Sequence, residues 1–177
     1  NSGDTAHFIT HYSPALFAKL LEDLEEGNLS EIDRIQLLNE TTLLIRGGLI
    51  GSAELIPLIT AFKDETSEPV WGMISLALSE LRKFVEDDPE AEASLRELSR
   101  TIAQKQYQRL GWNEDDGESE EDAKLRAIII GLTLYGEDAE AITMARHLYD
   151  TTQIESLNPE LRPLIISSVV RYGDNQI

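Results

Sequence analysis

The stretch "SPALFAKLLEDLEEG", residues 13–27, contains the start, the apolar face and the end of one helix. Ser13 is a suitable N-cap and Pro14 a suitable first helical residue. Leucine and phenylalanine then recur at the spacing of a single helix face, and Gly27 ends the segment. The pattern predicts an amphipathic helix, and patterns of the same kind recur along the rest of the chain.

Seven further helices are predicted, each opened by a capping residue or a proline. Their expected starts are Ser30, Ser52, Pro69, Asp88-Pro89, Ser119, Asp138 and Asn158-Pro159. Helices joined by short turns are expected to be antiparallel neighbours. The sequence therefore predicts an all-α fold of about eight helices, an irregular α-solenoid of antiparallel helical hairpins of the HEAT or armadillo kind.

Two local patterns do not fit a simple row of helices. Residues 4–12, "DTAHFITHY", are rich in β-branched and aromatic residues and predict one strand. A single strand cannot complete its own ladder, so we expect it to be the last strand of a sheet outside this chain. Pro57 and Pro163 each lie about five positions after an expected N-cap, where the ring clashes with a helical carbonyl. We expect a kink at each, or a helix start shifted toward the proline.

Composition argues against several classes of partner and site. The chain has 15 basic and 33 acidic residues, a net charge of −18, so phosphate backbones and anionic membrane surfaces would be repelled. No apolar stretch reaches the ~18–20 residues of a spanning helix. Without cysteine, disulfides, thiolate catalysis and cysteine-based metal sites are excluded. We expect a cytoplasmic protein with no nucleic-acid and no membrane partner.

The histidines give little support for a catalytic or metal site. His7 and His11 have the spacing of the zinc motif H-E-x-x-H, but Phe8 stands where the glutamate base must be. On a strand their rings would lie ~13 Å apart, which is too far for one zinc ion. His147 precedes Asp150 on a predicted helix, where a His–Asp pair could orient a general base. We expect an exposed helix residue there, since no nucleophile or second ligand is fixed nearby.

The loop 113–122 is rich in acidic residues, so we considered a calcium site there. With Gly117 at position 6 of an EF-hand loop, however, position 1 becomes Trp112, and the match fails. A solvated acidic loop is the preferred interpretation, and a calcium-tuned module remains a third, weaker hypothesis. Nucleotide-binding motifs are absent from the sequence.

The tryptophans and the arginines of this chain each have two possible roles. Trp71 and Trp112 are expected to be core anchors between stacked helices, with surface docking as the alternative. Most arginines are expected to form surface or inter-helix ion pairs, and a few to point into a cavity where they can grip a carboxylate. These arginines are Arg34, Arg46, Arg126, Arg146, Arg162 and Arg171.

Several short motifs follow one another in a fixed order along nearly the whole chain. They are Tyr12 at the end of the strand, Asp33-Arg34, Glu65 before Trp71, Gly111-Trp112, Leu125-Arg126, Pro159 with Leu161-Arg162, and Arg171-Tyr172-Gly173. This ordered set resembles the C-terminal helical domain of zinc aminopeptidases of the aminopeptidase N type, which include the endoplasmic-reticulum aminopeptidases. The opening "HYSPALFAKLLEDLEEG" most resembles the bacterial, lactic-acid-type members.

The resemblance implies a specific role for each part of the chain. Residues 1–12 would be the last strand of a preceding β-sandwich domain, and residues 13–177 the first part of the helical domain. The parent enzyme would remove N-terminal amino acids from peptides with a zinc-activated water. This domain would cap the active-site chamber and control peptide access. Its partners would be the upstream catalytic and β-sandwich domains, together with the peptide substrate.

The resemblance assigns no catalytic, cofactor-binding or metal-binding residue to this chain. In the family, the H-E-x-x-H motif, the third zinc ligand and the catalytic tyrosine belong to an upstream domain. Zinc is therefore expected in the parent's catalytic domain, and the chain alone is expected to lack peptidase activity. The alternative is a free-standing acidic α-solenoid that binds a protein or peptide on its concave face.

Overall fold

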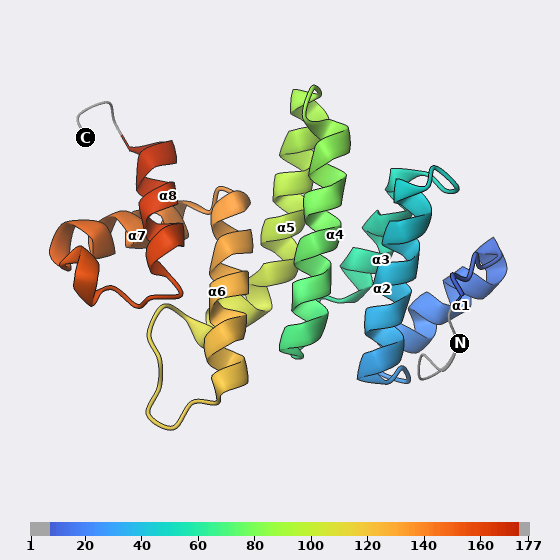
Figure 1. The fold of residues 1–177 in the computed structure, drawn as a ribbon, viewed down its shortest axis with the longest axis horizontal. Helices are drawn as coiled ribbons and strands as arrows, with labels where there is room; N and C mark the ends of the chain where they lie inside the picture. The colour runs from blue at the N-terminus through green and yellow to red at the C-terminus, as the bar shows by residue number, and fades with distance from the viewer. Residues whose placement is uncertain (1–7, 174–177) are drawn as a thin grey trace. The chain divides into compact units, whose positions relative to one another are not determined.

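The computed structural model describes residues 8–173 of the chain. Within this range the chain forms eight α-helices, two short 3-10 turns and no strand (Figure 1). The helices are α1 (Pro14–Glu25), α2 (Glu31–Arg46), α3 (Leu55–Ala61), α4 (Glu68–Val85), α5 (Pro89–Leu110), α6 (Glu120–Tyr135), α7 (Ala139–Thr151) and α8 (Arg162–Tyr172). The predicted all-α fold class with about eight helices is confirmed.

The predicted strand over residues 4–12 is not tested in full. Residues 1–7 lie outside the described range, and residues 8–13 have no regular secondary structure. A strand needs the ladder of a neighbouring strand, and the described part of this chain contains none. The division into residues 1–12 and 13–177 therefore stays a prediction.

Side-chain caps fix most of the helix starts where the sequence places them. The hydroxyls of Ser30 and Ser119 accept backbone N–H bonds from Asp33 at 3.2 Å and Asp122 at 3.0 Å. The carboxylate of Asp138 accepts one from Ala141 at 2.9 Å. Each cap satisfies one of the N–H groups that a helix start leaves without a partner.

At both prolines the helix begins closer to the proline than its N-cap suggests. This is one of the two outcomes that the sequence predicts; the other was a kink. A 3-10 turn, Ser52–Glu54, precedes α3, and Pro57 lies in the first turn of that helix. The predicted start of α8 at Asn158 is wrong, because α8 begins at Arg162 with Pro163 in its first turn. A helix continuing from Asn158 would need the missing N–H of Pro163 and would place its ring against the carbonyl of residue 159.

The chain divides into two compact units, residues 1–95 and 96–177. In the first unit α2 packs on α4 and α3, and α1 packs on α3; α2 and α4 are seen side by side in Figure 1. Fully buried side chains of this unit include Leu38, Leu58, Phe62, Trp71 and Ile74. The prediction that Trp71 is a core anchor is confirmed.

In the second unit α7 and α8 pack on each other, and both contact α6. Its core contains Ile130, Leu134, Ala141, Ala145, Leu157, Leu161 and Ile165. Trp112 is half-buried and packs against this core, so its predicted role as an anchor is confirmed in a weaker form. None of the described helices combines the length and the apolar character that a membrane crossing requires.

Gly136 allows a close helix crossing in the second unit. A Cβ atom at this position would lie 2.7 Å from the Cβ of Arg100 and 3.0 Å from the backbone oxygen of Arg96. The hydroxyl of Ser99 donates to the carbonyl of Leu132 at 3.0 Å, and the Arg100 guanidinium donates to that of Gly136 at 3.2 Å. Side chains of α5 thus cap the carbonyls at the end of α6, which they reach because residue 136 has no side chain.

Candidate functional site

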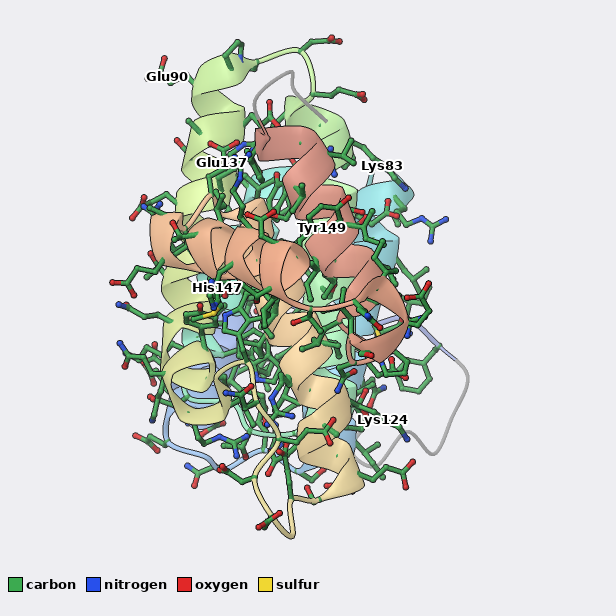
Figure 2. The ribbon with its side chains drawn as sticks, turned by 90° about the vertical axis from the view of Figure 1, so that its left-hand side faces the viewer. Lys83, Glu90, Lys124, Glu137, His147 and Tyr149 are labelled. Atoms are coloured by element: carbon green, nitrogen blue, oxygen red, sulfur yellow. The ribbon has the colours of Figure 1, made fainter. Side chains whose placement is uncertain are left out.

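The described residues contain no group of three or more histidine, cysteine, aspartate or glutamate residues arranged to hold a metal ion. His147 is exposed on α7 and is labelled in Figure 2, and Asp150 is exposed near the end of the same helix. His11 lines a small cavity of about 110 Å³ together with Tyr12 and Phe17, whereas His7 lies outside the described residues. The structure brings none of these histidines into a constellation for acid–base or metal chemistry within the described range.

The motif residues of the first unit form a hydrogen-bonded clamp. Arg34 on α2 pairs with Glu65, whose Oε2 lies 2.7 Å from Nε. The Oε1 atom of Glu65 accepts backbone N–H bonds from Thr66 and Ser67, both at 2.8 Å. The indole of Trp71 donates to the carbonyl of Glu65 at 3.0 Å. We call Arg34, Glu65 and Trp71 the first clamp; it fixes the turn between α3 and α4 onto α2.

A cavity opens beside the first clamp, between the turn that follows α1 and the turn between α3 and α4. Its volume is about 360 Å³, and Arg34 and Glu65 form part of its wall. Buried Phe62 contributes to the lining, and the exposed side chains of Glu25 and Lys63 also border it. Of the arginines for which the sequence analysis left open a place in a cavity, Arg34 borders this one.

A second Arg–Glu pair holds the loop between α5 and α6. Arg126 on α6 donates from Nη2 to Oε2 of Glu118 at 2.6 Å and from Nε to the carbonyl of Leu110 at 3.2 Å. Their side chains are 3% and 10% exposed, so both charges are withdrawn from water. The indole of Trp112 donates to the hydroxyl of Tyr107 at 2.8 Å. We call Arg126, Glu118 and the Leu110 carbonyl the second clamp.

The acidic loop 113–122 is only partly the solvated loop that was expected. Residues 113–117 are exposed, but Glu118 is partly buried and pairs with Arg126. Glu114 accepts from the Asn158 amide at 2.7 Å, and Asp122 pairs with Arg109 at 2.7 Å. Hydrogen bonds and ion pairs therefore connect the loop to α5, to α6 and to the segment before α8. All these partners belong to the second unit.

The pKa values of two of these acids follow their arginine partners. The hydrogen bond from Arg126 lowers the pKa of Glu118, against a smaller opposing effect of burial. The hydrogen bond from Arg109 likewise lowers the pKa of Asp122. In contrast, burial raises the pKa of Tyr107. These shifts describe groups that stabilise the fold, since ion pairs favour the charged form of a carboxyl.

The other four arginines named in the sequence analysis make contacts of different kinds. Arg46 lies 3.9 Å from Glu80, and Arg162 donates to the carbonyls of Glu155 at 3.2 Å and Leu157 at 3.1 Å. The Arg171 guanidinium lies over the ring of Tyr172, 5.4 Å from its centroid. Arg146 is exposed, with no ion pair to any residue of the described range. Two of the six arginines thus belong to the clamps, Arg46 forms an ion pair with Glu80 between α2 and α4, and the others lie at the surface or cap carbonyls.

Sequence reasoning missed the partners Glu118 and Glu40. Glu118 was grouped with its exposed neighbours, and only its position eight residues before Arg126 sets it apart. Glu40 on α2 is 4% exposed and accepts from the Gln36 amide at 3.0 Å. The four-residue spacing of Gln36 and Glu40 is the one available signal for that contact.

Known proteins match this chain over its whole length. A family model described as "ERAP1-like C-terminal domain" matches residues 1–177. A protein named aminopeptidase N from Lactobacillus helveticus is 33% identical over all of this chain, which covers 21% of that relative. Aminopeptidase N from Lactococcus lactis subsp. cremoris is 33% identical over 97% of the chain and 20% of the relative. Aminopeptidase 2 from Candida albicans is 24% identical over 99% of the chain. The chain spans about one fifth of the length of these relatives.

Proposed function

Because this chain belongs to the family of ERAP1-like C-terminal domains, we propose that it is a non-catalytic helical domain of a larger zinc aminopeptidase. The observation that carries this proposal is the match over the full chain to relatives named aminopeptidase N, of which it covers about a fifth. This coverage favours a domain of a longer protein over a free-standing peptide-binding module.

We propose that the parent removes N-terminal amino acids from peptides and that its zinc ion is bound by an upstream catalytic domain. We propose that the residues of the cleavage step also belong to that upstream domain. The partners of this chain are then the catalytic and β-sandwich domains of the parent, and the peptide substrate. The cytoplasmic location expected from the sequence stays a prediction.

The proposed role of the helical domain is to cap the active-site chamber and to limit which peptides enter. A cap of this kind excludes bulk water and restricts the positions available to a substrate. It must keep its shape while peptides enter and leave. The two clamps support this requirement, because each anchors an inter-helix connection to a neighbouring helix through several hydrogen bonds.

An activity measurement tests the non-catalytic assignment. The purified chain is incubated with zinc and an aminoacyl-p-nitroanilide, and release of p-nitroaniline is followed by absorbance. We expect no turnover above that of a heat-denatured sample, while the full-length parent under the same conditions hydrolyses the substrate. Turnover by the purified chain that is abolished by a chelator would overturn the assignment.

A further inference from the structure

The cavity beside the first clamp has the size of a small-ligand site. Its volume is about 360 Å³. Ligand sites in proteins generally occupy ~300–1,000 Å³, so this cavity lies at the lower end of that range. It suits a ligand of the size of one amino acid better than an extended peptide.

The wall of the cavity is held in place before any ligand arrives. Glu65 accepts two backbone N–H bonds and pairs with Arg34, and Phe62 is only 1% exposed. Arg34 also donates to the carbonyl of Leu29 at 2.9 Å. A preformed wall reduces the ordering cost of binding, which matters most for a small ligand with few contacts.

Two opposite charges at the cavity lack ion-pair partners. Arg34 and Glu65 neutralise each other, whereas Glu25 and Lys63 form no ion pair with any residue in the described range 8–173. Both are exposed on the cavity lining; Glu25 is the last residue of α1, and Lys63 follows the end of α3. Besides the Arg34–Glu65 pair, the cavity lining therefore carries the ammonium group of Lys63 and the carboxylates of Glu25 and Asp64.

We propose that this cavity binds a free α-amino acid in its zwitterionic form. The ligand's ammonium group pairs with Glu25, and its carboxylate pairs with Lys63. A simple anion would satisfy Lys63 alone and would face the carboxylates of Glu25 and Asp64, which also line the cavity. A zwitterion satisfies both charges at once. Because both partners are exposed and screened, the dissociation constant is expected to be millimolar.

The inference rests on the cavity and not on the proposed function. If the parent is an aminopeptidase, the ligand belongs to the class of its own products, and the cavity becomes a site at which product can act on the helical domain. Binding to the chain is measured without any peptidase assay, so failure of one proposal leaves the other standing.

Amide chemical shifts of the 15N-labelled chain, titrated with L-leucine, test the proposal. We expect saturable shift changes at the backbone amides of Gly27, Lys63 and Thr66, which belong to the cavity lining. N-acetyl-L-leucine lacks the ammonium group and L-leucinamide lacks the carboxylate, so each is expected to bind at least about threefold more weakly. Equal affinity for all three compounds, or no saturable change at these amides, would overturn the proposal.

Substitutions at the two exposed charges assign the contacts. Glu25→Gln is expected to abolish the preference for L-leucine over N-acetyl-L-leucine, and Lys63→Gln the preference over L-leucinamide. Glu22→Gln and Lys19→Gln, on α1 but outside the cavity lining, are the matched controls and keep both preferences. A double variant Glu25→Gln/Lys63→Gln that binds L-leucine as tightly as the unchanged chain would contradict the assignment.

Discussion

Each clamp anchors a connection between two helices, but the hydrogen bonds of the two clamps are satisfied to different degrees. In the first unit, Glu65 accepts two backbone N–H bonds in addition to its pairing with Arg34. In the second, Glu118 accepts from Arg126 and from the Asp115 N–H at 3.1 Å. The Oε1 atom of Glu118 and the Nη1 atom of Arg126 are buried without a hydrogen-bond partner in the described structure, whereas the first clamp leaves one such atom, Nε of Arg34.

From this difference we expect the two arginines to contribute unequally to the free energy of unfolding. Removing one partner of a buried ion pair lowers the free energy of unfolding, because the other charge stays in the protein interior without an opposite charge. Glu65 keeps its backbone donors when its arginine is removed, whereas Glu118 keeps one. The first clamp is also closer to water, since the Arg34 side chain is 21% exposed and that of Arg126 is 3% exposed.

The largest expected effect is that of Arg126→Ala. We expect it to lower the free energy of unfolding by about 3–5 kcal/mol, because Glu118 and the Leu110 carbonyl lose their main donor. Arg34→Ala is expected to cost about 1–3 kcal/mol, since the backbone donors to Glu65 remain. Urea denaturation followed by circular dichroism measures both, with the exposed Arg146→Ala as control. Equal losses for the two clamp variants would show that the comparison is wrong.

A pair of glycine substitutions is expected to act in opposite directions in the two units. Gly136→Ala would place a Cβ atom 2.7 Å from that of Arg100, and we expect a loss of about 1–3 kcal/mol. Gly72 lies inside α4 with no atom within 4 Å of an added Cβ. Gly72→Ala is therefore expected to stabilise by about 0.5–1 kcal/mol through helix propensity. Thermal denaturation gives both signs, and destabilisation by both would contradict the packing described for α4.

The two tryptophans differ in burial, since Trp71 is fully buried and Trp112 is half-buried. Trp71→Phe removes the donor to the Glu65 carbonyl in a fully buried site, with an expected cost of about 1–2 kcal/mol. Trp112→Phe removes a bond to the Tyr107 hydroxyl in a half-buried site, with an expected cost of about 0.5–1 kcal/mol. Circular dichroism melting curves compare them, and a larger loss for Trp112→Phe would reverse the assigned importance.

The smallest expected effect is a change in pH dependence at Glu118. Its pKa is lowered in the folded state, so it stabilises the fold at pH values above its unfolded pKa of about 4.3. That stability is lost as the pH falls through the lowered folded value. The difference in unfolding free energy between the unchanged chain and Glu118→Gln should therefore shrink below about pH 4. A difference that stays constant down to pH 3 would argue against the pair.

Much of the fold could be predicted because helix starts and ends are local. Ser119 and Asp138 accept the N–H bonds that their positions before apolar helices predict. The start of α8 was placed too early because Asn158-Pro159 has good local capping chemistry. The ring of Pro163, which excludes a helix through residue 159, decided the boundary instead.

The clamps were harder to predict for two reasons. One glutamate partner is distant in sequence from its arginine, and the other lies among several acidic residues that look alike in the sequence. Arg34 and Glu65 are separated by 31 positions, so only the ordered motifs pointed to both. Glu118 lies among acids of similar local sequence, and its burial depends on the placement of α6 against the loop. The cavity beside the first clamp depends on three separate segments meeting, which no local pattern encodes.

The central claim is that this domain covers the substrate chamber of a larger aminopeptidase. The most direct test uses the full-length parent and a peptide with a zinc-binding group at its N-terminal end and a photoreactive group near its C-terminal end. After irradiation and proteolysis, mass spectrometry identifies the modified residues. We predict adducts within residues 13–173 that are lost when unlabelled peptide competes. Adducts found exclusively outside this chain would contradict the claim.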